Sequence, residues 1–177
     1  MADCIICQIV EGKIPSKKVY EDDELVAILD VNGANPGHCF VIPKQHFPIM
    51  EQVPDNIIAK AFSVANKISI SIFDELKAQG TNLFVANGIP AGQKVAHFMI
   101  NVVPRYEGDI VNMTWKPRQL SEEEMSAVEL KIKEHSENIG GFSVSSKPKS
   151  LDSKKIESIS SEEDEDNYLM KSLTRIP

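Results

Sequence analysis

The chain has 177 residues, of which 42% are hydrophobic, and it carries a formal net charge of −7. This length and composition suit one globular domain with a tail and exclude a wholly disordered chain. An acidic balance without a dense basic cluster argues against non-specific binding to nucleic acid or to an acidic membrane surface. No apolar run approaches the ~20 residues that a membrane-spanning helix needs.

The cysteine content and the N-terminus favour a cytoplasmic protein. Three cysteines, an odd number, argue against a disulfide scaffold. A secretory signal would carry a basic segment before a hydrophobic stretch, whereas this N-terminus contains Asp3 and no such segment.

The first part of the chain predicts one short helix and three strands. An apolar helix is expected over residues 1–12, where a glycine ends it. Turn-rich segments then separate three apolar runs. These runs predict strands at Val19–Tyr20, Glu24–Leu29 and Cys39–Ile42.

A long helix is predicted next. Asp55 is expected to be its N-cap, and Gly80 is expected to end it just after Ala78. Apolar residues at the helical period predict one buried stripe. The stripe consists of Ile58, Ala61, Phe62, Ala65, Ile68 and Ile72.

Two more strands and a final helix follow. The strands are predicted at Thr81–Ala86 and His97–Val103. Ser121 and Glu124 form a capping-box pattern for a helix that runs to about Glu137. Strands and helices without regular βαβ alternation indicate an α+β fold.

The composition divides the chain into three parts. Residues 1–137 are predicted to form the folded domain. Residues 138–166 are serine-rich and end in an acidic run, so this part is expected to be a disordered linker. Residues 167–177 regain apolar side chains and form a short C-terminal segment that is a candidate contact for a protein partner.

Two motifs contain residue types that can bind a metal ion or take part in catalysis. Cys4 and Cys7 form a CxxC pair, which suits zinc when two further ligands are present, and no βαβ unit supports a thioredoxin-like alternative. In the segment 97–103, strand alternation puts His97, Met99 and Asn101 on one face.

These motifs and several others, in order along the chain, resemble the histidine-triad (HIT) family, whose signature is His-φ-His-φ-His-φ-φ with φ apolar. The further matches are Gly12-Lys13-Ile14-Pro15, Pro36-Gly37-His38, Val41-Ile42-Pro43-Lys44-Gln45-His46, Ala91-Gly92-Gln93 and Pro104-Arg105. The resemblance implies a five-stranded, mostly antiparallel sheet with helices. It also implies a homodimer in which two such sheets become continuous.

The resemblance implies a structural zinc ion, because the zinc-binding branch of the family uses the CxxC and two histidines. The corresponding ligands here are Cys4, Cys7, His46 and His97. The alternative interpretation is two buried cysteines and two histidines that are satisfied by hydrogen bonds.

The resemblance also implies a nucleotide pocket. Asp30 corresponds to the aspartate that accepts hydrogen bonds from the ribose, and Gly92 and Gln93 belong to the loop near the α-phosphate. The residues that match the base contacts are Ile5, Ile6, Ile9, Ile28 and Val31. The alternative is that Asp30 only caps the turn at Asn32 or Gly33 and that the isoleucines are core.

This chain departs from the family where the phosphate would react. Met99 stands at the position of the nucleophilic histidine and Asn101 at the third histidine, so no catalytic triad is intact. Ala86 and Lys94 replace two further phosphate-side residues. We therefore expect a protein that binds a purine nucleotide or nucleoside monophosphate with little or no hydrolysis.

Two other functions stay open at this point. One is an active nucleotide hydrolase or transferase, for a dinucleoside polyphosphate or a nucleoside phosphoramidate, with a rearranged site. The other is an interaction protein that acts through its C-terminal tail.

Overall fold

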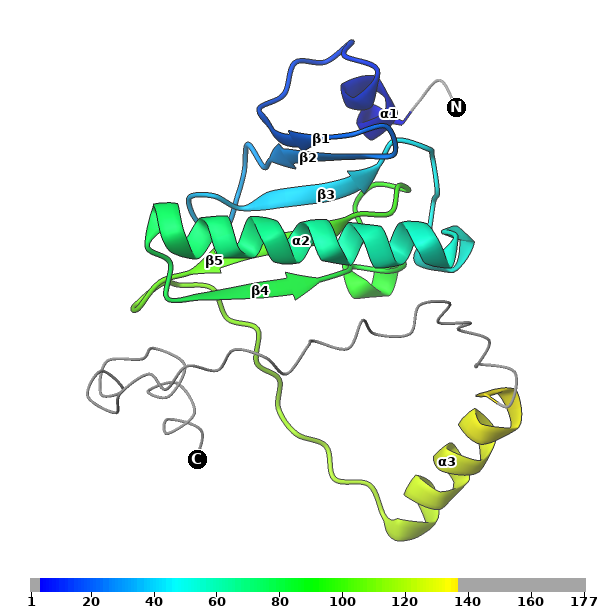
Figure 1. The fold of residues 1–177 in the computed structure, drawn as a ribbon. Helices are drawn as coiled ribbons and strands as arrows, with labels where there is room; N and C mark the ends of the chain where they lie inside the picture. Colours follow the sequence, from blue (N-terminus) through cyan, green and yellow to red (C-terminus); the bar gives the residue numbers. More distant parts are fainter. Residues whose placement is uncertain (1–3, 137–177) are drawn as a thin grey trace, which may run out of the picture. The chain divides into compact units, whose positions relative to one another are not determined.

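The computed structural model describes residues 4–136, and it divides the chain into two units, residues 1–115 and 116–177 (Figure 1). All five strands belong to the first unit. The predicted linker 138–166 and the C-terminal segment 167–177 lie outside the described residues. The domain boundary at residue 137 stays a prediction.

The first unit is built on one antiparallel sheet with the strand order β1-β2-β3-β5-β4. The strands are β1 Lys18–Glu21, β2 Leu25–Leu29, β3 Cys39–Pro43, β4 Gly80–Phe84 and β5 Ile100–Arg105. This arrangement confirms the predicted five-stranded sheet and the α+β class. Strands β1 and β4 form the two edges of the sheet.

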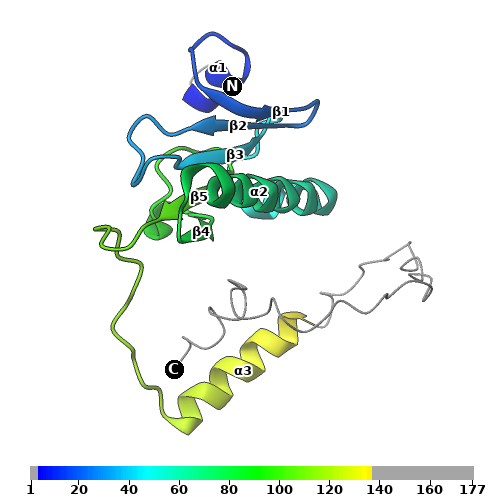
Figure 2. The ribbon, with the colours of Figure 1, turned by 60° about the vertical axis from the view of Figure 1, so that its left-hand side comes forward.

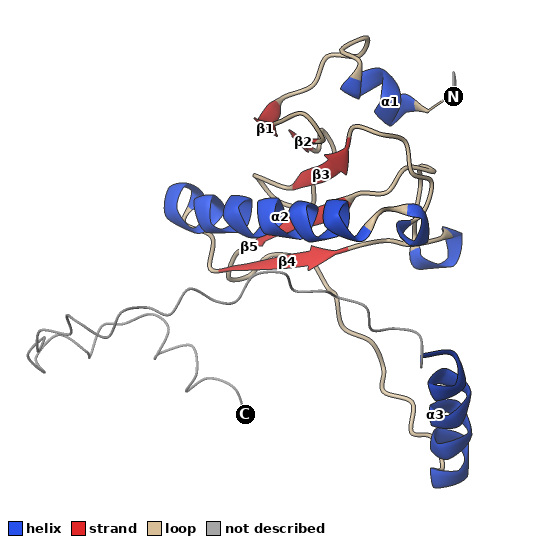
Figure 3. Cartoon of the chain, turned by 45° about the vertical axis from the view of Figure 1, so that its right-hand side comes forward, coloured by secondary structure: helices blue, strands red, loops and turns tan. Residues whose placement is uncertain are grey.

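Helices α1 (Ile5–Val10) and α2 (Asp55–Leu76) cover opposite faces of the sheet, since they pack against strand residues that alternate along β2 and β3. Figures 1 and 2 show α2 lying along one face, and Figure 3 shows α1 near β1 and β2. The core on the α2 side includes Leu25, Ala27, Val41, Ala61, Ala65, Ile72, Ile100 and Val102. A smaller core on the α1 side consists of Ile6, Val26, Ile28 and Ile42.

Helix α2 differs from its predicted form at both ends. Pro54 is the N-cap and Asp55 is the first helical residue, so the predicted cap was one residue late. The helix ends at Leu76 because Lys77 adopts a left-handed conformation with a φ of 55°. Gly80, the predicted stop, begins β4 instead.

The predicted stripe of α2 was wrong at Phe62, which is 38% exposed. Val64 and Ser69 are buried in addition to the correctly predicted Ala61, Ala65 and Ile72. Ser69 can be buried because its hydroxyl lies 2.7 Å from the hydroxyl of Thr81 on β4 and forms a hydrogen bond with it.

The remaining helices are short or belong to the second unit. Two 3-10 helices, η1 (Met50–Gln52) and η2 (Ile89–Ala91), interrupt the loops of the first unit. In the second unit, α3 (Glu122–Ser136) begins with the predicted capping box. The Ser121 N–H donates to Glu124 at 2.8 Å, and the Glu124 N–H donates to the Ser121 hydroxyl at 3.2 Å. No helix among residues 4–136 is long and apolar enough to span a membrane.

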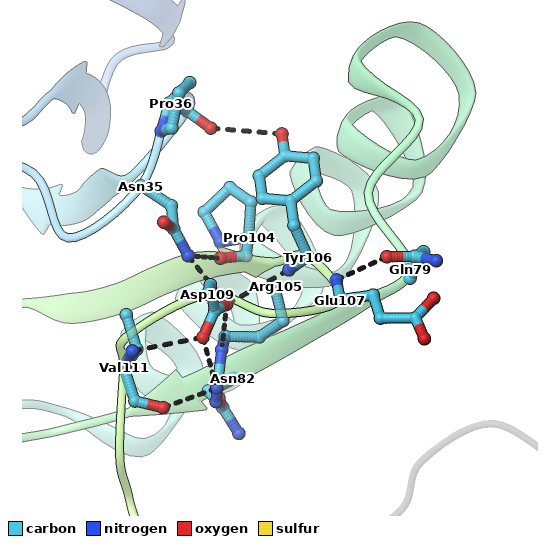
Figure 4. A network of polar contacts seen from close by, with 10 residues as sticks. All are labelled: Asn35, Pro36, Gln79, Asn82, Pro104, Arg105, Tyr106, Glu107, Asp109 and Val111. Atoms are coloured by element: carbon cyan, nitrogen blue, oxygen red, sulfur yellow. Dashed lines mark hydrogen bonds and ion pairs between the residues drawn. The ribbon is translucent and has the colours of Figure 1, made fainter.

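A polar network attaches the β2–β3 loop to the end of β5 (Figure 4). The Arg105 guanidinium binds both carboxylate oxygens of Asp109, at 2.7 and 2.8 Å. The amide of Asn35, in the β2–β3 loop, donates to Asp109 and to the Pro104 carbonyl, both at 2.9 Å. This network has no local signature in the sequence, and it holds the β2–β3 loop at the end of β5.

Asp109 is the centre of the network, because it also accepts the backbone N–H groups of Tyr106 and Val111. The Arg105 guanidinium and these N–H groups hold the pKa of Asp109 well below its usual range. The carboxylate therefore stabilises the fold above the unfolded-state pKa of about 3.9, and this contribution is lost as the pH falls through the lower folded-state pKa.

We expect Asp109→Asn to lower the melting temperature at neutral pH, because the amide cannot replace the bidentate pairing with Arg105. The difference from the unsubstituted protein should shrink as the pH falls below about 4. Thermal denaturation at several pH values tests this, with Asp23→Asn, at an exposed turn residue, as the control. A difference of the same size at neutral and acidic pH would contradict the assigned role of the carboxylate.

Candidate functional site

Two thiols and two imidazoles meet between the N-terminal segment and the sheet. The Cys7 thiol lies 3.2 Å from Nδ1 of His46 and 3.7 Å from Nδ1 of His97. The Cys4 thiol lies 3.6 Å from the same His97 nitrogen. One ligand atom from each of the four residues lies within 4.8 Å of all the others. The structure therefore brings together all four residues that the sequence suggested as metal ligands.

The geometry of this cluster suits a tetrahedral ion. In a zinc site with Zn–S bonds of about 2.3 Å and Zn–N bonds of about 2.0 Å, the ligand atoms lie about 3.3–3.8 Å apart. The sulfur–nitrogen distances of the cluster are close to this range. The rings of His46 and His97 stand edge to face, with their centroids 5.0 Å apart, so the two imidazoles approach the thiols from different directions.

His97 is fixed in the orientation that a metal ligand needs. Its side chain is fully buried, and its Nε2–H donates to the Pro43 carbonyl at 2.9 Å, which leaves Nδ1 facing the thiols. Burial lowers the pKa of His97 despite this hydrogen bond, so the ring is kept neutral. Burial and the neighbouring Cys4 raise the pKa of the Cys7 thiol.

The residues at the other two triad positions follow the predicted alternation. Strand β5 begins at Ile100, three residues later than predicted, because residues 97–99 are not paired with a neighbouring strand. The side chains still alternate: Phe98 and Ile100 are in the core on the α2 side, and Met99 packs against the core on the α1 side. Asn101 lies beyond Met99, buried and in contact with His38.

Asp30 lines a cavity in the β2–β3 loop. One carboxylate oxygen accepts the Asn32 N–H at 2.9 Å, as the turn interpretation predicts. The other oxygen lies 3.6 Å from Nδ1 of His38. The cavity has a volume of about 340 Å³ and is lined by Leu29, Asp30, Gly33, Ala34, Asn35, Pro36, Gly37 and His38.

The apolar residues assigned to the base are divided between core and surface. Ile6 and Ile28 are buried in the core on the α1 side, and Ile9 packs against it. Ile5 is 48% exposed and Val31 is 91% exposed. Of the five, Ile5 and Val31 are therefore the side chains with the most exposed apolar surface.

Gln93 organises the loop that was assigned to the phosphate. Its side-chain oxygen accepts the Gly88 N–H at 2.8 Å, and its NH₂ group donates to the carbonyls of Pro48 and Val95 at 2.7 and 3.0 Å. Both donors of the amide are thus used within the protein. Gly92, one residue earlier, is exposed and has a φ of 89°, a conformation that favours glycine.

Asn87 also has a role in the protein that the sequence did not reveal. Its amide oxygen accepts the Met50 N–H at 2.9 Å, and its NH₂ group donates to Glu51 at 2.8 Å. Lys94 is exposed at the end of the same loop. The pairing of His38 with Asn101 was likewise missed, because residues 63 apart in sequence carry no local signal of contact.

Comparison with known proteins places the chain in a family. The family model described as the HIT domain matches residues 11–108. An uncharacterized HIT-like protein of Methanocaldococcus jannaschii, MJ0866, is 41% identical over 106 residues, which cover 60% of this chain and 81% of that protein.

Solved structures of similar proteins carry the same fold. A Zn-bound histidine triad family protein from Mycobacterium smegmatis matches with a TM-score of 0.61 and 30% identity, over 76% of this chain and 98% of that one. A histidine triad nucleotide-binding protein from Candida albicans matches with a TM-score of 0.68 and 25% identity, over 78% of this chain and all of that one. The chain therefore belongs to the HIT family.

Proposed function

We propose that this chain is a HIT protein that binds a purine nucleotide without efficient turnover and that holds a structural zinc ion. The observation that carries the proposal is Met99, which stands at the position of the family's nucleophile and packs against the core on the α1 side. The surrounding site keeps Asp30, the glycine-rich loop and the Cys–His cluster.

The zinc part of the proposal rests on the donor set and its supports. Two thiolates and two imidazoles are a common structural zinc set, and a closed set of four protein ligands leaves no position for substrate. The Pro43 carbonyl orients His97 from behind, as second-shell groups do for metal-bound histidines. The M. smegmatis neighbour, described as Zn-bound, supports the same assignment. When bound, the ion would join the N-terminal segment to the centre of the sheet.

We expect the purified protein to contain one zinc ion per chain and to lose melting temperature when a chelator removes it. Cys7→Ser should reduce the zinc content to near zero, because a hydroxyl is a poor replacement for a thiolate ligand. Cys39→Ala is the matched control, since Cys39 is buried in the core on the α2 side, outside the cluster. Elemental analysis and thermal denaturation are the measurements, and full zinc content in Cys7→Ser would overturn the assignment.

The nucleotide part of the proposal rests on Asp30. Within the described residues its second carboxylate oxygen receives no backbone N–H, and Asp30 lines the cavity of the β2–β3 loop, where it can accept ribose hydroxyls. The exposed apolar surface of Ile5 and Val31 is available to cover a base. The C. albicans neighbour is described as nucleotide-binding, which supports the same ligand class here.

The lack of turnover follows from the side chains at the reacting position. The family's reaction needs an imidazole that attacks phosphorus and is then released by water, and a thioether cannot complete that cycle. Asn101 donates a hydrogen bond but cannot transfer a proton. Loss of a nucleophile can reduce a rate on the order of 10⁶-fold, which corresponds to roughly 8 kcal/mol of activation free energy.

We expect calorimetry to detect saturable binding of AMP to the zinc-loaded protein, and Asp30→Asn to weaken it by about tenfold through the loss of charge-assisted hydrogen bonds to the ribose. Asp23→Asn, at an exposed acidic turn residue outside the site, is the control. Equal affinities of the Asp30→Asn variant and the control would contradict the assigned role of Asp30. Hydrolysis of adenosine phosphoramidate at rates typical of the family would support the active-enzyme alternative.

We also propose a homodimer through the β4 edge. Among the described strands β4 is an edge that pairs on one side only, and Leu83 on β4 and Phe62 and Ile70 on α2 are exposed apolar side chains. Pairing of two β4 edges would make the two sheets continuous and cover such side chains.

We expect Leu83→Glu to shift the protein toward the monomer, since a charge at this edge would be buried in the dimer. Val19→Glu, at an exposed apolar residue of the opposite edge strand β1, is the matched control. Sedimentation velocity measures the oligomeric state. The proposal would be contradicted if the unsubstituted protein were a monomer at all concentrations. It would also be contradicted if Val19→Glu shifted the protein toward the monomer more than Leu83→Glu does.

A further inference from the structure

His38 is a buried histidine that the proposed chemistry does not use. It is 8% exposed and lies between the two residues Asp30 and Asn101. Nδ1 of the ring is 3.1 Å from the Ala34 N–H, which donates to it, and 3.6 Å from the free oxygen of Asp30. Nε2 is 3.4 Å from the side-chain oxygen of Asn101. The ring therefore contacts three groups of different hydrogen-bonding character.

These contacts define the proton position in the neutral ring. Because Nδ1 accepts the Ala34 N–H, the single proton of neutral His38 resides on Nε2, where it points at the Asn101 oxygen. The NH₂ group of Asn101 donates to the Phe84 carbonyl at 3.4 Å, so its oxygen faces His38 as an acceptor. Because an amide does not titrate near neutral pH, the Asn101 oxygen can accept the Nε2–H of His38 whether the ring is neutral or protonated.

Protonation would change the contacts at Nδ1 only. A proton on Nδ1 faces the Ala34 N–H, so that hydrogen bond must break, while the same proton gains the nearby Asp30 carboxylate as a partner. Asp30 would then use its free oxygen for His38. That is the oxygen available to the ribose in the proposed function.

We propose that His38 makes nucleotide binding pH-dependent: the neutral ring leaves Asp30 available to the ribose, and the protonated ring pairs with Asp30 and releases Ala34. This inference rests on the proposed function, because the ligand that competes with His38 is the ribose of a nucleotide. A histidine is suited to such a switch because its ordinary pKa is about 6.5.

The surroundings of His38 favour this two-state behaviour. Among its contacts in the described part of the chain, Asp30 is the one charged group, and the others are the Ala34 N–H, the Asn101 amide and the ring of Phe40 at 5.2 Å. The turn packs closely on the histidine, since a Cβ at Gly33 would lie 2.9 Å from Cβ of His38. Loss of the Ala34 hydrogen bond is therefore transmitted to the turn that lines the cavity.

NMR of the isotopically labelled, zinc-loaded full chain tests the switch without any ligand. We expect the amide resonance of Ala34 to move as the pH is lowered, with the same midpoint as the His38 ring. A His38 ring that does not titrate between about pH 8 and pH 5, or an Ala34 amide that ignores its titration, would overturn the proposal.

Calorimetry with AMP and with adenosine then tests the effect on binding. If only the neutral ring permits binding, the affinity for adenosine should fall between about pH 7.5 and about pH 5.5 by the factor by which the NMR titration shows the fraction of neutral His38 to fall. Adenosine is included because it has no phosphate, whose own titration and attraction to a protonated histidine would obscure the effect for AMP. His38→Gln should bind adenosine with the same affinity at both pH values.

The outcomes separate this inference from the proposed function. If the affinity for adenosine is equal at both pH values, the switch is overturned and the proposed function stands. The same conclusion follows if His38→Gln keeps the pH dependence of the unsubstituted protein. If neither AMP nor adenosine binds at about pH 7.5, the proposed function is overturned, and so is the proposed effect of His38 on binding. The NMR titration of the unsubstituted protein then decides whether the turn itself responds to His38.

Discussion

The alternation of side chains from His97 to Val102 is the constraint on which the rest of this structure depends. Phe98, Ile100 and Val102 form the centre of the core on the α2 side, so His97, Met99 and Asn101 must face the other way. A shift by one residue would turn His97, Met99 and Asn101 into the core on the α2 side and remove Phe98, Ile100 and Val102 from it, so the register is strongly specified. The same alternation that builds the core therefore presents three side chains to the site.

Those three side chains now have three different uses. His97 is directed into the Cys–His cluster by its hydrogen bond to Pro43, Met99 packs against the core on the α1 side, and Asn101 contacts His38. A family that positions three imidazoles on this face for chemistry is represented here by one metal-ligand candidate, one apolar contact and one amide. The scaffold is retained while Met99 and Asn101 stand at positions where the family signature has histidines, which is the physical basis of the proposed loss of turnover.

Features with a local signature were the ones that the sequence predicted well. The capping box of Ser121 and Glu124, the five strands and the CxxC pair all follow from residue types at fixed short spacings. The end of α2 was wrong because it depends on the left-handed conformation of Lys77, for which a lysine gives no signal. The exposure of Phe62 was missed because the helical period alone does not say where the sheet ends.

Contacts between distant residues could not be predicted in the same way. The network around Asp109 and the contact between His38 and Asn101 join segments that only the folded sheet brings together. His46 and His97 lie far from Cys4 and Cys7 in the sequence, so only the family resemblance links these two histidines to the CxxC pair. The isolated CxxC is a weak signal for zinc, and the alternative interpretation is two buried cysteines.

We propose that the protein binds a purine nucleotide without efficient turnover. The most direct test is a calorimetric titration of adenosine phosphoramidate into the zinc-loaded protein, with the mixture analysed afterwards for AMP. A saturating isotherm without continuing heat and without AMP is the result that the account predicts, because the pocket would then be intact and the nucleophile missing. Continuous heat with the appearance of AMP would contradict it and identify a working enzyme.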